Sequence, residues 1–258
     1  MALDQEIGTI AWYSLMTTDA AKATEYYSKL FQWDVQEMEI EGMGKAPFYS
    51  AAGKAFGSPM NLDPQVGSPS HWIPYFTVAD VDASCQTVES LGGKVCHPAF
   101  DMPSIGRTAI ITDPFGGAFH LFTPENKEQD INVMGGEPGQ PCWLELMVDD
   151  LNVAKSFYGS LLSWTIAEQD MGMPDPYVLG KSGEAMVAGI AKRPEGAPPI
   201  NLWLPYFMVP NLKESISQAA NLGGESMMEP MAVPGVGEFS LYADPSGAVS
   251  YLFQGEST

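Results

Sequence analysis

The positions of tryptophan constrain this chain more than any other feature of its sequence. Six tryptophans stand among the 258 residues, at positions 12, 33, 72, 143, 164 and 203. Adding 131 to each of the first three positions gives the last three, with none left over. A repeat of this length is far above the period of solenoid proteins, so each copy is expected to be a module of domain size.

Many other residues follow the same shift. The matching pairs are Asp19 and Asp150, Tyr27 and Tyr158, Tyr75-Phe76 and Tyr206-Phe207, Leu91-Gly92-Gly93 and Leu222-Gly223-Gly224, and the turns Asp113-Pro114-x-Gly116 and Asp244-Pro245-x-Gly247. Chance does not keep so many residues in one register. The chain is therefore interpreted as an internal duplication.

Each half divides again into two similar units. The first unit begins with a strand over 9–16, rich in aromatic and β-branched residues. Asp19 then stands at an N-cap position before a segment, 20–31, whose apolar residues recur at helical spacing. One strand, one helix and three strands follow each other four times, in units at about 8–63, 71–124, 140–195 and 202–255. This order predicts an α+β fold with an antiparallel or mixed sheet and helices on one face.

The connector between the halves reads PENKEQDINVMGGEPGQ, which is polar and rich in glycine and proline. Such a composition is typical of an exposed linker. We therefore expect a first module over residues 1–125, a linker over 126–140 and a second module over 141–258.

The net charge of −20, from 12 basic and 32 acidic residues, excludes two classes of partner. A field of this sign repels phosphate backbones and anionic lipids, so neither nucleic acid nor a membrane surface is an expected partner. Solubility explains the charge more simply than recruitment of a basic partner. We expect a cytoplasmic protein, because the sequence has three cysteines without a CxxC motif, no visible signal peptide and no long apolar stretch. The expected oligomeric state is a monomer or a homodimer.

The motifs resemble those of the vicinal oxygen chelate superfamily, which is also called the glyoxalase/bleomycin-resistance/dioxygenase fold. The first half carries Trp12-x-x-Leu15-x-x-x-Asp19, Leu30-Phe31-x-Trp33 and Tyr75-Phe76-x-Val78-x-Asp80, followed by the glycine helix stop and the Asp-Pro-x-Gly turn. The second half repeats the motifs in the same order. Within the superfamily the chain is similar to two-module proteins described as lactoylglutathione-lyase-like. The resemblance implies four βαβββ units that form two curved mixed sheets with helices outside.

Enzymes of this superfamily usually hold a divalent metal with His, Gln or Glu side chains from the strands. The resemblance places such ligands seven residues before the Asp that follows a first strand, and seven residues after the Asp of the Asp-Pro-x-Gly turn. The residues at these six positions are Trp12, Ile73, Trp143, Leu204, His120 and Tyr251. Only His120 is an ordinary metal ligand. No cofactor is therefore predicted, and a divalent metal is expected only if a non-standard site exists.

Residues at and near these positions form a candidate ligand pocket, because alternate residues of a strand face the same side. The candidate ligand-binding residues are Trp12, Ser14, Tyr75, Trp143, Tyr206 and Tyr251. Aromatic surroundings with a few polar groups are usual for small-molecule sites. The alternative, of equal weight, is that the aromatic residues simply fill the core.

Two residues are candidates for catalysis. Glu145 replaces Ser14 of the first half and lies within an apolar strand, where a carboxylate needs a partner. His120 occupies a family ligand position. A structural role is the first interpretation of each residue, and a general base or substitute metal ligand is the second. The two side chains would meet if the second and third units shared a cavity.

Three functions remain open. The favoured one is a small-molecule-binding protein whose aromatic cleft lacks the usual metal ligands. The second is a metal-dependent lyase, isomerase or dioxygenase that uses a non-standard site. The third is a structural or interaction protein with filled cavities. Whether the chain is an enzyme is left open.

Overall fold

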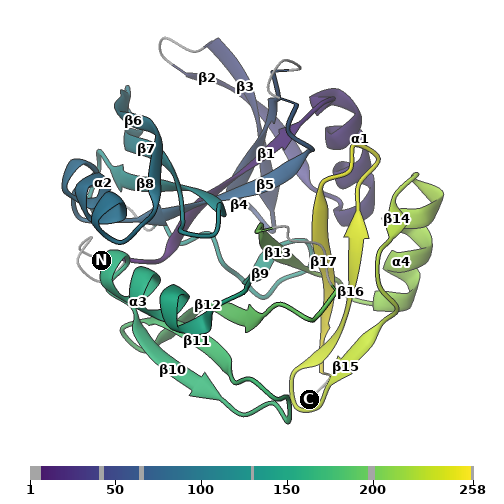
Figure 1. The fold of residues 1–258 in the computed structure, drawn as a ribbon. Helices are drawn as coiled ribbons and strands as arrows, with labels where there is room; N and C mark the ends of the chain where they lie inside the picture. Colours follow the sequence, from purple (N-terminus) through teal and green to yellow (C-terminus); the bar gives the residue numbers. More distant parts are fainter. Residues whose placement is uncertain (1–6, 41–43, 64–66, 129–130, 197–200, 257–258) are drawn as a thin grey trace. The chain divides into compact units, whose positions relative to one another are not determined.

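The chain was analysed as a computed structural model, which describes residues 7–40, 44–63, 67–128, 131–196 and 201–256. Figure 1 shows the strands and helices along the chain. Within these residues no helix combines the length and the apolar character required to cross a membrane.

Among the described residues, the first half contains two helices and eight strands. Their bounds are β1 (Ile10–Thr17), α1 (Ala20–Phe31), β2 (Asp34–Ile40), β3 (Gly44–Ala51), β4 (Lys54–Asn61), β5 (His71–Thr77), α2 (Val81–Ser90), β6 (Lys94–Met102), β7 (Gly106–Thr112) and β8 (Ala118–Pro124). The predicted order of one strand, one helix and three strands is therefore present twice.

The second half repeats this order. Its elements are β9 (Pro141–Val148), α3 (Leu151–Leu161), β10 (Thr165–Gln169), β11 (Tyr177–Ser182), β12 (Ala185–Lys192), β13 (Trp203–Met208), α4 (Leu212–Asn221), β14 (Glu225–Ser226), β15 (Met231–Val233), β16 (Gly237–Ala243) and β17 (Val249–Gly255). The one difference is that two short strands, β14 and β15, stand where the other units have a single strand.

The strands form two mixed sheets, one from each half. The strand orders are β2-β3-β4-β1-β5-β8-β7-β6 and β10-β11-β12-β9-β13-β17-β16-β14, with β15 paired to β16. In every unit the first strand runs parallel to the last, as β1 does to β4, whereas the hairpins between them are antiparallel. The predicted α+β class with four βαβββ units is confirmed. The residue bounds given above for modules and linker stay a prediction.

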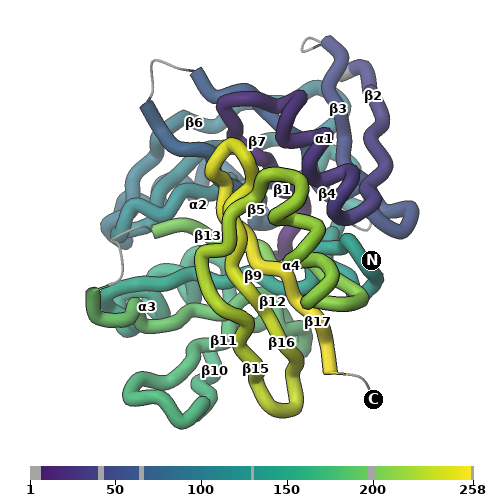
Figure 2. The backbone as a smooth tube through the Cα atoms, turned by 90° about the vertical axis from the view of Figure 1, so that its right-hand side faces the viewer, coloured from purple at the N-terminus to yellow at the C-terminus, as the bar shows by residue number. Residues whose placement is uncertain are grey.

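Helix α1 begins after Asp19, as the sequence predicted, and the other helices begin in the same way. Asp19, Asp80, Asp150 and Asn211 are the N-cap residues, and each side chain accepts a hydrogen bond from a backbone N–H of the first turn. Such a bond satisfies one of the donors that a helix start leaves without an intrahelical partner. After α2 and α4 the chain turns at Gly92 and Gly223, whose φ angles of 86° and 91° favour glycine. Each helix packs on strands of its own βαβββ repeat, as α4 does on β16 and β17 (Figure 2).

The compact packing units do not follow the halves of the sequence. One unit, here called the 2/3 unit, contains 1–12, 73–132 and 144–203. The other, the 1/4 unit, contains 13–72, 133–143 and 204–258. Each unit therefore combines one βαβββ repeat from the first half with one from the second. Within the units, α2 contacts α3 and α1 contacts α4.

An aromatic cluster forms the core of the 1/4 unit. Trp33 and Trp72 meet edge to face at 6.3 Å between ring centroids, and Phe207 lies 5.1 Å from Trp33 and 5.4 Å from Trp72. The Trp33 indole donates a hydrogen bond to the Gly139 carbonyl at 2.7 Å. Gly139, which belongs to the connector, therefore contributes to the core of the 1/4 unit.

The 2/3 unit repeats this arrangement with the halves exchanged. Trp164 and Trp203 meet at 6.4 Å, and Phe76 lies 5.5 Å from Trp164 and 5.3 Å from Trp203. The Trp164 indole donates to the Gly8 carbonyl at 2.8 Å. All these residues are related to those of the other unit by 131 positions. The repeated tryptophans therefore build one core design twice, and each copy takes residues from both halves.

A buried carboxyl group lies beside each core, in the Asp-Pro-x-Gly turn. Asp113 accepts hydrogen bonds from the backbone of Phe115 and Gly117 through Oδ1 and from the Tyr158 hydroxyl through Oδ2, at 2.7 Å. Its equivalent, Asp244, binds the backbone of its own turn, but its Oδ2 atom is buried without a hydrogen bond of acceptable geometry. Burial raises the pKa of Asp244 above its ordinary value. The nearby Tyr27 hydroxyl opposes part of this rise.

The two core glycines give a matched pair of substitutions. Both have positive φ, 80° at Gly8 and 82° at Gly139, so alanine is strained at either position by about 1–2 kcal/mol. A Cβ at Gly8 would lie 2.5 Å from the Leu162 carbonyl oxygen, whereas the nearest atom to a Cβ at Gly139 is 3.0 Å away. Gly8→Ala is expected to lose roughly 1–3 kcal/mol more than Gly139→Ala because of this overlap. The shift of the urea unfolding midpoint measures the difference, and equal shifts would contradict it.

The Tyr158–Asp113 pair gives a second prediction. Tyr158→Phe leaves a buried carboxylate oxygen unpaired and is expected to lower the free energy of unfolding by about 1–3 kcal/mol. Burial already raises the pKa of Asp113, and loss of the Tyr158 hydrogen bond raises it further. An acid whose pKa is raised in the folded state destabilises that state when the acid is ionised. The loss of stability in Tyr158→Phe should therefore be larger at neutral pH than near pH 4. Urea unfolding at both pH values measures the two losses, and equal losses would contradict this prediction.

Candidate functional site

The six family ligand positions all lie on first or last strands of their units. Trp12 is on β1, Ile73 on β5, Trp143 on β9, Leu204 on β13, His120 on β8 and Tyr251 on β17. Trp12, Trp143 and Leu204 are half-buried, and the other three residues are buried. Neither indole is therefore on the fully exposed surface, as a cleft position requires.

His120 is held between a hydroxyl group and an aromatic ring. Its ring stacks on Tyr75 at 3.9 Å between centroids, with an interplanar angle of 9°. Its Nδ1 atom lies 3.0 Å from the Thr108 hydroxyl, which donates its own proton to the Leu121 carbonyl at 2.9 Å. The hydroxyl has only one proton, so Nδ1–H must be the donor to it. This tautomer leaves the lone pair of the imidazole on Nε2.

Burial controls the protonation of this ring. Desolvation lowers the pKa of His120 to about 3, with a smaller contribution from His97. The imidazole is therefore neutral at physiological pH. A neutral ring with its lone pair on Nε2 can accept a proton or a hydrogen bond, but it cannot donate a proton as a general acid.

An apolar cluster surrounds the Tyr75 side of this stack. Its buried members are Ala11, Tyr75, Phe122 and Ile131, and its half-buried members are Trp12, Met102 and Ile105. All belong to the 2/3 unit. The predicted ligand-binding residues Trp12 and Tyr75 are therefore brought together, with a partly accessible surface of aromatic, Met and Ile side chains.

The 1/4 unit contains the equivalent stack. Tyr206 and Tyr251 lie 4.0 Å apart with an interplanar angle of 22°, and Phe239 and Phe253 flank Tyr206. The stack thus survives although Tyr251 replaces His120. The Cys142 thiol contacts the Tyr206 carbonyl oxygen at 3.4 Å.

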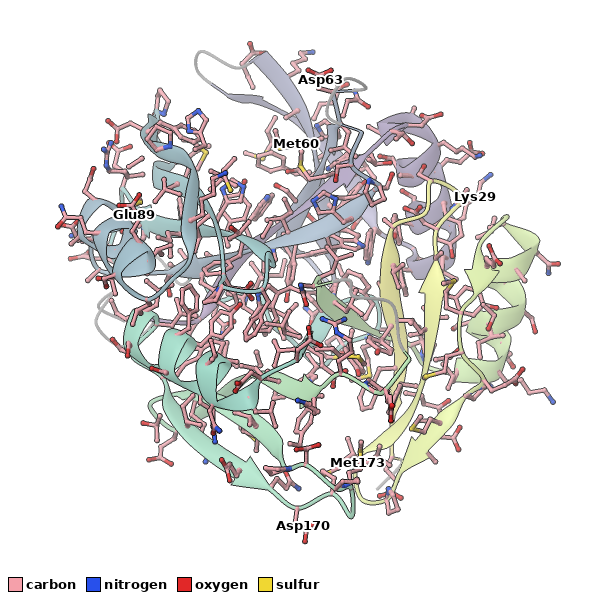
Figure 3. The ribbon with its side chains drawn as sticks, viewed as in Figure 1. Lys29, Met60, Asp63, Glu89, Asp170 and Met173 are labelled. Carbon is pink, nitrogen blue, oxygen red and sulfur yellow. The ribbon has the colours of Figure 1, made fainter. Side chains whose placement is uncertain are left out.

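Ser14 is buried, and its hydroxyl donates to the Met60 sulfur at 3.7 Å. Figure 3 labels Met60, which belongs to β4. Met60 also lines a surface hollow of about 770 Å³ beside the start of α1, and a second hollow, of about 310 Å³, lies between Val78 and Leu161. Both hollows are open to solvent, and none of the predicted site residues lines them.

Glu145 has a partner that the sequence did not reveal. The Tyr177 hydroxyl of β11 donates to Glu145 Oε2 at 2.8 Å. Both side chains are half-buried. The contacts of His120 are with Thr108 and Tyr75. The predicted contact between His120 and Glu145 is not one of them. Their catalytic roles stay a prediction.

The residues present do not fit the divalent metal that the fold family implies. Indole and aliphatic side chains stand at four of the six ligand positions, and they have no lone pair for a cation. His120 offers one nitrogen and Tyr251 one phenol. Throughout the described part of the chain, no group of three His, Cys, Asp or Glu side chains is placed to hold a metal ion.

Sequence reasoning missed three residues: Thr108, Tyr177 and Gly189. Thr108 fixes the tautomer of His120, and Tyr177 binds Glu145 across Gly189. A comparison of the two halves of the sequence could have identified Tyr177 and Gly189. Tyr177 stands opposite Ala46, and Gly189 opposite Ser58, in the register that places Glu145 opposite Ser14.

Comparisons with known proteins agree with this fold. Residues 9–121 match the family model of the Glyoxalase/Bleomycin resistance protein/Dioxygenase superfamily. CFP32 of Mycobacterium bovis, which carries a provisional glyoxylase name, is 34% identical over 247 residues, covering 94% of this chain and 93% of that protein. The anthracycline biosynthesis protein DnrV of Streptomyces peucetius is 29% identical over 255 residues, covering 93% and 91%. The chain belongs to the glyoxalase/bleomycin resistance protein/dioxygenase superfamily.

Solved structures show the same fold at low identity. The Mn(II)-bound glyoxalase of Novosphingobium aromaticivorans has a TM-score of 0.63 and 15% identity, over 96% of this chain and 82% of that one. The 2,3-dioxygenase LapB of Pseudomonas sp. KL28 has a TM-score of 0.65 and 12% identity, over 98% and 94%. The resemblance drawn from the repeated motifs is confirmed.

The environment of His120 predicts its titration. With a folded pKa of about 3, its imidazole NMR signals should not shift between pH 5 and 8, whereas in urea the ring should titrate near 6.5. The unfolded chain then binds more protons below about pH 6.5, so His120 favours folding less as the pH falls from there toward 3. His120→Phe should flatten this acid loss of stability. A folded-state titration near pH 6.5 would show that the ring is not desolvated.

Proposed function

We propose that this protein binds a small apolar or aromatic molecule on the aromatic surface formed by Trp12, Tyr75 and their neighbours, without a divalent metal at the family's usual ligand positions. The second module carries an equivalent candidate surface at Trp143, Tyr206 and Tyr251. The fold and the family are established above, and the proposal concerns what the site does.

One observation carries the proposal. In each half, the residue at the ligand position of the last strand belongs to an aromatic stack, Tyr75 on His120 in one and Tyr206 on Tyr251 in the other. A filled core would also stack these rings, but Trp12, Met102 and Ile105 keep part of their surface accessible next to the first stack. Exposed apolar surface with few polar groups is the usual character of a small-molecule site.

Binding of a neutral aromatic probe, 2-naphthol, tests this proposal. Trp12→Ala and Tyr75→Ala should each weaken the affinity measured by isothermal titration calorimetry roughly tenfold or more, because an aromatic contact surface is worth about 1.5–3 kcal/mol. Treatment with EDTA should leave the wild-type affinity unchanged. Phe100→Ala is the control, since Phe100 is half-buried and packs on His97 outside the cluster.

The main alternative is a metal-dependent lyase, isomerase or dioxygenase with a non-standard site. The lone pair on Nε2 of His120 is the observation in its favour, and Glu145 would have to contribute from another sheet. A stoichiometric divalent metal in the purified protein, removed by EDTA together with probe binding and lost again in His120→Phe, would support this alternative and contradict the proposal. Complete failure of 2-naphthol to bind would favour filled cores.

A further inference from the structure

The half-sheet of β9 and β10–β12 has two different faces. Val178, Ala188, Ile190, Leu144 and Leu146 are fully buried on the face that α3 covers. Except for Val187 and Gly189, which are buried, the residues that alternate with them are half-buried. These include Glu145, Met147, Tyr177, Leu179 and Ala191. Because alternate strand residues point to opposite faces, the second set forms a single, partly accessible surface.

Glu145 and Tyr177 are the polar pair of this surface. Strand register places Leu179 beside Gly189 and Gly189 beside Glu145. The Tyr177 side chain crosses over Gly189 and its hydroxyl donates to Glu145 at 2.8 Å. A Cβ on Gly189 would overlap both the hydroxyl and the ring of Tyr177. Gly189 therefore makes room for the contact.

The three residues that build this contact differ together from the first repeat. Ser14, Ala46 and Ser58 occupy the positions of Glu145, Tyr177 and Gly189. The backbone is otherwise conserved between the two half-sheets: Ser14 pairs with Ser58 as Glu145 pairs with Gly189, and both hairpins shift register at the equivalent residue. A purely structural role does not require the change, since the first repeat forms the same half-sheet without it.

The chemistry of the pair selects its ligand. A carboxylate only accepts hydrogen bonds, and the Tyr177 hydroxyl uses its single O–H to donate to Glu145. The oxygen atoms of both side chains therefore offer a ligand lone pairs. The neighbours on this face, Leu179, Met147 and Ala191, are apolar and raise the strength of a charge–charge contact by excluding water. The net charge of −20 also attracts cations at long range.

We infer that the Glu145–Tyr177 pair binds the ammonium group of a small cationic ligand with an apolar body, and that Gly189 positions Tyr177 for this contact. The inference rests on the proposed small-molecule function and names the ligand class for the second module. Glu145 supplies the charge, Tyr177 fixes the orientation of the carboxylate, and the apolar face receives the body of the ligand.

Three probes of similar shape separate charge from other contributions. They are 2-phenylethylammonium, 2-phenylethanol and propylbenzene, with affinities measured at pH 7 by NMR shifts of the protein. The wild-type protein should bind the ammonium probe about tenfold or more tightly than the alcohol, because hydrogen bonds to charged groups exceed neutral ones by roughly this factor. The shifts should centre on β9, β11 and β12.

Three variants and one control assign the preference. Glu145→Gln should remove the preference for ammonium and leave the affinity for propylbenzene unchanged. Gly189→Ala and Tyr177→Phe should each reduce the preference severalfold, the first by displacing the hydroxyl and the second by deleting it. Ser58→Ala, the matched change in the first repeat, should have no effect. Tyr177→Phe keeps the test available if Gly189→Ala does not fold.

The outcomes separate the two proposals. Equal affinity for all three probes, or a preference for ammonium that survives Glu145→Gln, overturns this inference and leaves small-molecule binding in place. Failure of all three probes to bind also overturns this inference, and the 2-naphthol measurement then decides the proposed function separately. Loss of the preference in Glu145→Gln together with its reduction in Tyr177→Phe supports the inference.

Discussion

The hydrogen bond from a core tryptophan to a glycine carbonyl of the other half organises this protein. Trp33 bonds to Gly139 in one unit and Trp164 to Gly8 in the other. Both indole N–H groups are buried among aromatic rings, where a donor without a partner would cost free energy. The segment before each first strand therefore packs against the helix and strands of the other half, and each core is completed by both halves of the sequence.

This exchange explains why the cores diverged little while the accessible faces diverged freely. A substitution in one core acts on residues of both halves at once, so Trp33, Trp72 and Phe207 have unchanged counterparts. Residues on the half-buried faces have no such restriction. There, Glu145 stands where the first repeat has Ser14. A duplicated fold can thus hold two unlike sites on one scaffold.

The character of the sites follows from what replaced the ligands. An aromatic ring at a ligand position contributes stacking surface in place of a lone pair, and the Tyr75–His120 stack buries the single remaining imidazole so far that it stays neutral. A carboxylate then appears at a neighbouring position in the second module, with a tyrosine that orients it.

The sequence alone determined the duplication, the order of elements, the helix start at Asp19, and the superfamily. These features are local or periodic, so residue spacing records them. Only the tertiary structure decided that the compact units cross the halves, that Thr108 fixes the tautomer of His120, and that Tyr177 reaches Glu145 over Gly189. These contacts join residues 12 or more positions apart on different strands. Strand register and packing create them, and no spacing rule in one sequence encodes which strands become neighbours.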